Sequence, residues 1–164
     1  MQIRIDDLTG QDVADLLQAH LEYCRTWSPP ESVHALDLNV LRAPGITFWA
    51  AWDAGNLLGC GALKELDPSH GEIKSMHVAA RHRSRGVAAA MVRHIVAEAR
   101  ARCYRRLSLE TGSMKAFAPA RALYARCGFV GAGPFGDYVA DPNSVFMTLD
   151  LTAPLGRPGE RRDP

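Results

Sequence analysis

The feature that most constrains the fold is a change of hydrophobic periodicity between residues 72 and 102. Residues 72–78 alternate with the two-residue period of a strand, whereas residues 84–102 carry an apolar stripe at helical spacing. The loop between them is basic and ends in glycine and alanine. The start of a helix has unpaired N–H groups, and these groups together with the helix dipole favour an anion. The segment therefore predicts a strand–loop–helix unit with an anion site at its turn.

The rest of the chain supplies the other layers of an α/β protein. Further strands are predicted over 2–6, 46–52, 57–66, 106–110, from 129 and over 144–151, and helices before the Pro29–Pro30 pair, over 32–41 and over 117–127. Gly59 and Gly61 inside one strand indicate a bend or a close approach of another backbone. Two-residue alternation would place Glu72, Lys74, Met76 and Val78 on one face of their strand, and Ile73, Ser75 and His77 on the other. Residues 152–164 are rich in proline, glycine and arginine and are expected to form a disordered tail.

Composition argues against several classes of protein. Lys and Arg total 19 and Asp and Glu total 18, a net charge of +1, whereas a nucleic-acid-binding domain usually has a strong basic excess. No apolar run approaches the roughly 18 residues of a membrane span. The four cysteines and the histidines lack the spacing of a metal site, so we predict no metal. A cytoplasmic protein with free thiols is the expectation.

The basic loop predicts a local anion site rather than a general surface for polyanions, and it fits a pyrophosphate. It reads Arg83-x-x-Gly86-x-Ala88, and both the G-x-x-x-x-G-K-[ST] and the G-x-G-x-x-G phosphate-binding patterns are absent. Gly86 and Ala88 let a ligand approach the backbone, and Arg83 and Arg85 add positive charge. The alternative is that both arginines are solvated charges at the start of a helix.

This pattern resembles the signature of the GNAT superfamily of acetyl-CoA-dependent N-acetyltransferases. Tyr124-Ala125-Arg126-Cys127-Gly128-Phe129 resembles a second element of that family, and Glu72 stands where several members carry a general base. The order of elements matches over about residues 2–151. Leu109-Glu110-Thr111-Gly112 and Pro134-Phe135-Gly136-Asp137-Tyr138 are similar to a small bacterial subgroup. In one departure, Phe117 and Ala120 stand where many members have an asparagine that touches the cofactor.

The resemblance implies a single α/β (α+β) domain over residues 1–151. Its sheet would be mixed and mostly antiparallel, with six to seven strands and about four flanking helices. It also implies acetyl-CoA as co-substrate. The residues expected to bind it are Met76, His77, Val78, Arg83, Ser84, Arg85, Gly86, Val87, Ala88 and Ala89.

The implied reaction is direct attack of a primary amine, on a small molecule or a peptide, on the acetyl thioester. The amine must first lose a proton, and Glu72 is the expected base, directly or through water. A backbone N–H near His77 or Val78 would polarise the carbonyl, and Tyr124 would protonate the departing thiolate. As alternatives, Glu72 is a strand residue paired with Lys74 or Lys64, and Tyr124 is core packing.

The acceptor site is expected between the first two helices and the 131–141 loop. Its candidate residues are Glu110, Trp27, Trp49, Trp52, Phe135 and Tyr138. Each of them has a plain structural alternative as a core residue, a loop anchor or a strand end. The strand alternation makes Glu72 and His77 an unlikely pair. Exposed strand ends leave room for a homodimer. A second hypothesis is an acyl-CoA-binding regulatory module with little turnover.

Overall fold

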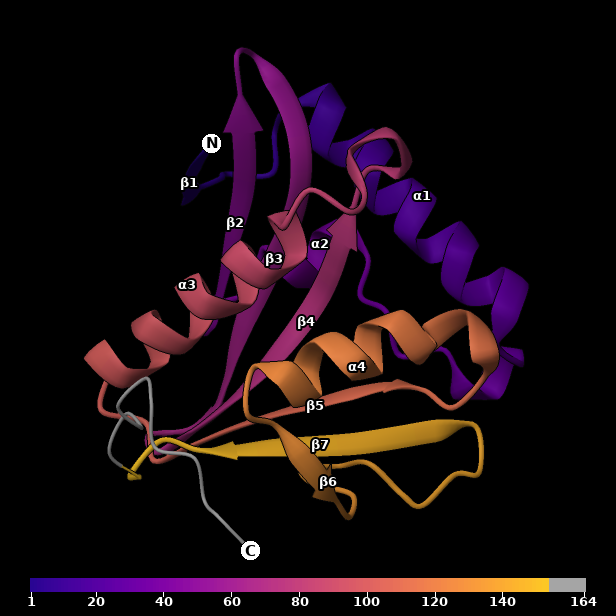
Figure 1. Cartoon of the computed structure of the whole chain (residues 1–164), viewed down its shortest axis with the longest axis vertical. Helices are drawn as coiled ribbons and strands as arrows, with labels where there is room; N and C mark the ends of the chain where they lie inside the picture. Colours follow the sequence, from indigo (N-terminus) through magenta and orange to yellow (C-terminus); the bar gives the residue numbers. More distant parts are fainter. Residues whose placement is uncertain (154–164) are drawn as a thin grey trace, which may run out of the picture.

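The computed structural model describes residues 1–153, which form one seven-stranded sheet in the order β1-β2-β3-β4-β5-β7-β6 (Figure 1). The strands are β1 (Gln2–Ile5), β2 (Ile46–Asp53), β3 (Asn56–Asp67), β4 (His70–Val78), β5 (Arg106–Gly112), β6 (Val130–Ala132) and β7 (Ser144–Asp150). Neighbouring strands are antiparallel except β4 and β5, which are parallel. The predicted mixed, mostly antiparallel sheet of six to seven strands is confirmed.

Helices cover both faces of this sheet. They are α1 (Gln11–Trp27), α2 (Leu38–Leu41), α3 (Val87–Ala101) and α4 (Ala118–Arg126). The predicted helix over 32–41 is wrong. Only Leu38–Leu41 is α-helical, with the Asp37 side chain accepting from the Val40 N–H at 3.0 Å, while Pro30–Ser32 is one 3₁₀ turn. The Ser32 hydroxyl does not cap a helix but donates to Asp141 Oδ2 at 2.6 Å.

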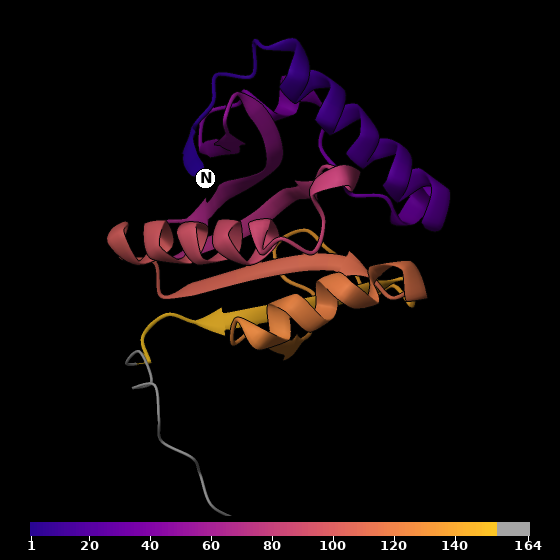
Figure 2. The ribbon, with the colours of Figure 1, turned by 45° about the horizontal axis from the view of Figure 1, so that its top comes forward.

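The two faces have separate cores. α3 and α4 pack on one face, where the predicted stripe of Met91, Ile95 and Ala99 is fully buried. α1 and α2 pack on the other, where Val13 and Leu41 are buried, and Figure 2 shows α1 set apart from α3 and α4. None of the helices within residues 1–153 has the length and hydropathy to span a bilayer. Of the predicted tail over 152–164, residues 154–164 lie outside the part of the chain that the structure describes.

A β-bulge in β4 changes which residues share a face. Ala62 of β3 lies opposite Lys74 and Cys60 lies opposite His77, so two steps along β3 match three along β4. The extra residue is accommodated at Ser75, whose φ is +55°. The extra residue reverses the alternation of faces beyond the bulge. The His77 side chain therefore lies on the α1 side of the sheet, as those of Glu72 and Lys74 do.

The side-chain contacts agree with this change of phase. A Cβ at Gly61 would lie 2.7 Å from Met76 Sδ and 2.8 Å from Met91 Cγ, which places Met76 on the α3 side. The His77 ring instead lies against His20 of α1. The predicted assignment of Met76 and Val78 to the face of Glu72, and of His77 to the opposite face, is wrong because simple alternation assumes a regular strand.

β4 and β5 separate beyond their first three pairs. The parallel pairing covers only His70–Glu72 with Arg106–Ser108, and the strands diverge toward their carboxyl ends (Figure 1). The β5-facing edge of β4 from residue 73 onward therefore has no strand partner in the described structure. This opening positions the candidate site.

Gly59 is the residue of β3 that lets the bulged part of β4 approach. A Cβ at Gly59 would lie 2.8 Å from the His77 carbonyl oxygen. The backbone of a paired strand cannot easily shift to relieve such a contact. We expect Gly59→Ala to lower the free energy of unfolding by about 1–3 kcal/mol, the usual cost of overpacking, measured by urea denaturation. The matched control is Gly131→Ala in β6, where a Cβ has open space. Equal stability of the two variants would contradict the close approach.

Candidate active site

A cleft of about 600 Å³ opens where β4 and β5 separate. The carboxyl-terminal halves of both strands line it, together with α1, the start of α3 and α4. It thus joins the predicted anion-binding turn to the predicted acceptor side of the sheet.

The start of α3 forms one end of the cleft. Gly86 caps this helix in a left-handed conformation with φ +76°, and a Cβ there would meet no atom within 4 Å. The first intrahelical hydrogen bond runs from the Ala90 N–H to the Gly86 carbonyl at 3.0 Å. The N–H groups of Val87, Ala88 and Ala89 therefore have no acceptor within the helix, which is the arrangement that binds phosphate.

Nearly all the predicted cofactor residues meet at this cleft. The lining set includes Met76, His77, Val78, Arg83, Ser84, Gly86, Val87, Ala88 and Ala89. Arg85 is not in it, and its Nη1 lies 3.4 Å from His82 Nδ1. The Arg83 guanidinium lies 5.6 Å from the centre of the Tyr23 ring, which connects the basic loop to α1.

A neutral histidine pair lines the wall formed by α1 and β4. His20 Nδ1 and His77 Nδ1 are 3.3 Å apart, and burial lowers the pKa of each to about 4. Cys24 Sγ lies 4.0 Å from His20 Nε2, and burial raises the pKa of this thiol to about 11. At neutral pH the wall therefore carries two uncharged imidazoles and a protonated thiol.

Sequence reasoning missed His20, Tyr23 and Cys24 as site residues. His20 and Cys24 continue the α1 stripe that begins with the buried Val13 and Leu17. The signal that could have identified them is that polar residues stand at the end of a buried stripe. A purely structural core would favour apolar side chains at those positions.

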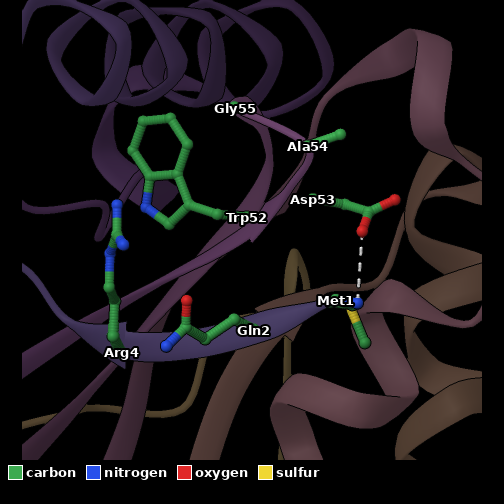
Figure 3. A pocket seen from close by; sticks show the side chains of 7 residues that line it. All are labelled: Met1, Gln2, Arg4, Trp52, Asp53, Ala54 and Gly55. Carbon is green, nitrogen blue, oxygen red and sulfur yellow. Dashed lines mark hydrogen bonds and ion pairs between the residues drawn. The ribbon is translucent and has the colours of Figure 1, made fainter.

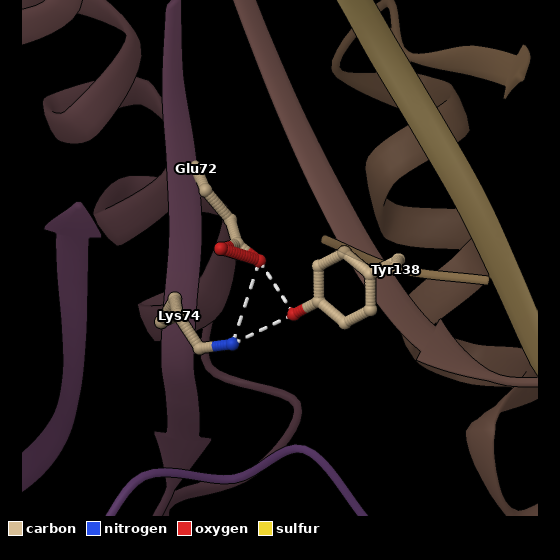
Figure 4. A network of polar contacts seen from close by, with 3 residues as sticks. All are labelled: Glu72, Lys74 and Tyr138. Carbon is tan, nitrogen blue, oxygen red and sulfur yellow. Dashed lines mark hydrogen bonds and ion pairs between the residues drawn. The ribbon is translucent and has the colours of Figure 1, made fainter. Parts of the chain in front are cut away.

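Glu72 lies at the closed end of the separation between the strands. It is 2% exposed, and it is not among the residues that line the cleft. The Tyr138 hydroxyl donates to Glu72 Oε2 at 2.6 Å, and Lys74 Nζ lies 3.4 Å from the same oxygen and donates to the Tyr138 oxygen at 2.8 Å (Figure 4). Burial and the Glu72 charge raise the pKa of Tyr138, so its phenol keeps the proton it donates. Lys74, one of the two lysines predicted to pair with Glu72, forms this ion pair.

Glu110 lines the cleft from β5. Burial raises the pKa of its carboxyl to about 7, while the Ser144 hydroxyl and the Lys74 charge act in the opposite direction. A carboxyl with this pKa exchanges a proton near neutral pH.

Tyr124 is a buried residue that also lines the cleft. It is 6% exposed, packs against Phe129 with ring centres 5.8 Å apart, and lines the cleft. Burial raises its pKa, so the phenol is protonated at neutral pH. A protonated phenol in a cleft is suited to donate to a developing anion.

The other predicted acceptor residues do not line the cleft. Trp27 ends α1 and is 50% exposed. Phe135 packs against His70, Tyr138 and Phe146 at ring separations of 5.0–6.0 Å. Tyr138 reaches the cleft through His34, a lining residue whose ring centre is 5.0 Å away.

A second hollow lies at the β1–β2 edge of the sheet (Figure 3). The Met1 ammonium pairs with Asp53 at 3.3 Å, and the Arg4 guanidinium lies 5.2 Å from the centre of the Trp52 ring. It shares no lining residue with the cleft, and Trp52 is the one predicted acceptor residue that lines it.

Sequence comparison relates the chain to known proteins. The sequence model of the acetyltransferase (GNAT) family matches residues 12–129. The chain is 58% identical over 151 residues to the uncharacterized N-acetyltransferase YsnE of Bacillus subtilis (strain 168), covering 92% of this chain and 100% of that protein.

Solved structures show the same fold. The putative acyl-CoA N-acyltransferase of Klebsiella pneumoniae superposes with a TM-score of 0.74 at 27% identity, over 92% of this chain and 97% of that one. A Bacillus subtilis acetyltransferase in complex with CoA gives a TM-score of 0.67 at 18% identity, over 91% and 97%. With a family match across most of its length and a close relative over nearly all of it, the chain belongs to the GNAT acetyltransferase family.

Proposed function

We propose that this protein transfers the acetyl group of acetyl-CoA to a primary amine of a small molecule or peptide by direct attack. The observation that carries the proposal is one continuous cleft with a helix start at one end and a carboxyl of raised pKa within it. The CoA complex of the Bacillus subtilis acetyltransferase supports the choice of cofactor. The N-acetyltransferase name of the close relative favours turnover over a regulatory module.

The residues at the start of α3 fit a pyrophosphate. The N–H groups of Val87, Ala88 and Ala89 supply donors, Gly86 leaves space, and Arg83 supplies charge. The unpaired edge of β4 around His77 and Val78 leaves backbone groups for the acyl-bearing arm and its carbonyl. Tyr124 is the proposed donor to the CoA thiolate. Glu72 and Glu110 are the two candidate bases.

Acetyl-CoA binding can be measured without knowing the acceptor. A ligand at about 100 times its Kd stabilises the folded state by about 2.7 kcal/mol. We expect acetyl-CoA and CoA to raise the Tm, and ATP and NAD at matched concentrations to leave it unchanged. No shift with either CoA species would contradict the proposed cofactor.

Gly86→Ala tests where the pyrophosphate binds. The new methyl group would enter the space in front of the α3 N–H groups, and we expect the acetyl-CoA shift to fall sharply. Gly55→Ala is the matched control, because Gly55 also has a positive φ (+79°) and open space around its Cβ but lies outside the cleft. Both variants should lose about 1–2 kcal/mol of stability from left-handed strain. An equal acetyl-CoA shift in both would place the pyrophosphate elsewhere.

Tyr124→Phe tests the leaving-group step. Loss of the hydroxyl should lower kcat about 10²-fold, within the usual range for general acid catalysis, and should leave the acetyl-CoA thermal shift intact. The readout is thiol release with the best acceptor from a panel of phenethylamine, tyramine, spermidine, lysine and an alanine dipeptide. Tyr104→Phe is the control, since Tyr104 is equally buried but donates to Glu65 outside the cleft at 3.3 Å. Wild-type kcat in Tyr124→Phe would exclude the role.

A further inference from the structure

We propose that Glu110, rather than Glu72, removes the proton from the acceptor amine, and that Glu72 is a positioning residue that holds the acceptor end of the cleft together. The inference rests on the proposed function and assigns the roles of the two carboxylates at that site.

Glu110 is more accessible from the cleft than Glu72. Glu72 stands opposite Ser108 in the last pair that β4 and β5 form, at the closed end of the separation. Glu110 lies two residues further along β5, beyond the paired region, and on the same face as Ser108 because strand residues alternate. Glu110 lines the cleft, whereas Glu72 does not. An amine entering the cleft therefore meets Glu110 first.

Glu72 is already engaged by other side chains. Glu72 Oε2 already faces two donors, the Tyr138 hydroxyl at 2.6 Å and the Lys74 ammonium at 3.4 Å. To accept a proton there, the buried Glu72 would have to give up its pairing with a buried lysine, which is costly. Glu110 forms no ion pair with any residue in the 1–153 segment.

Glu110 shares the cleft with side chains of α1 and α4. Its charge acts on Cys24 of α1, on Tyr124 of α4 and on Tyr138 of the 131–141 loop. In turn, the charges of Lys74, Glu72 and Asp141 act on Glu110. Glu110 thus lines the same cleft as Cys24 and the proposed acid Tyr124. Its pKa of about 7 lets it take up a proton and release it again at neutral pH.

The proposed transfer moves two protons from the amine nitrogen. The amine arrives as an ammonium ion and gives one proton to the Glu110 carboxylate. Its nitrogen lone pair then forms the C–N bond to the acetyl carbon while the C–S bond breaks. The second nitrogen proton is lost as the amide forms, and the thiolate takes up one proton through Tyr124, which that second proton restores. Glu110 returns its proton to solvent, so the net products are the amide, the CoA thiol and one proton.

Glu72 has a different task in this arrangement. Through Tyr138 it fixes the 131–141 loop against β4, and the Ser32 hydroxyl bound to Asp141 at 2.6 Å fixes the far end of that loop to the segment after α1. Removing the Glu72 charge should loosen the acceptor wall and raise the KM for the amine more than it lowers kcat.

The test compares Glu110→Gln and Glu72→Gln, with Glu98→Gln as the control, since Glu98 pairs with Arg102 on the surface of α3. The readouts are the acetyl-CoA thermal shift and the pH profile of thiol release with the best amine of the panel. We expect Glu110→Gln to keep the thermal shift and to lose at least 10²-fold in kcat/KM at pH 7. The deficit should shrink toward pH 10, where the amine loses its own proton. In the wild type, activity should rise with pH through about 7 as Glu110 ionises, and this limb should vanish in Glu110→Gln.

Glu72→Gln should retain the limb near pH 7 and raise the KM for the amine. If that variant does not fold, Tyr138→Phe removes the same loop contact and should raise the KM in the same way. Near-wild-type kcat/KM in Glu110→Gln, or a deficit independent of pH, would overturn the inference while leaving the proposed function standing. A wild-type protein that binds no CoA species and releases no thiol with any amine would overturn the proposed function itself.

Discussion

The structure depends on the extra residue that β4 accommodates at Ser75. By inserting one residue against β3, the bulge turns His77 toward α1 and Met76 toward α3. The partly buried Cys24, His20 and His77 thereby become one wall, and Met76 completes the α3 core. The same part of β4 has lost its pairing with β5, so the cleft forms within the sheet rather than in a loop on its surface.

Opening a sheet leaves backbone groups without a strand partner, among the described residues, on the β5-facing edge of β4, while the β3 side of the bulge stays closely packed. The Cys60 thiol donates to the Ser75 carbonyl at 3.2 Å on the β3 side of the bulge. Gly59 allows the His77 carbonyl to approach closely. On the side that faces β5, the start of α3 and α4 line the cleft together with the strands. The unpaired edge of β4 therefore faces a cavity whose wall includes polar side chains.

Two carboxylates on the same face of the sheet experience different surroundings. Glu72 is buried and held by a lysine and a tyrosine, whereas Glu110 is half-buried, lines the cleft and has no ion-pair partner among the described residues. Different environments give like groups different roles, because pairing stabilises the charged form and desolvation opposes it. The Lys74–Glu72–Tyr138 triangle also ties a glycine- and proline-rich loop to a core strand, which gives a loop with little intrinsic structure a defined place.

The sequence by itself determined the order of elements, the glycine-containing basic turn before the long central helix and the family, because periodicity and turn chemistry are local properties of the chain. It began that helix at residue 84, whereas α3 starts at Val87 with Gly86 as its cap. It could not determine the phase of β4 beyond Ser75, because a bulge depends on the register with a second strand. The helix predicted over 32–41 was also too long, because the Ser32 hydroxyl donates to Asp141 of a distant loop and does not cap a helix. The distinction between Glu72 and Glu110, and the assembly of His20, Cys24 and His77 into one wall, were decided only by tertiary structure. Burial, pairing and access are relations between segments far apart in the chain, and no local pattern records them.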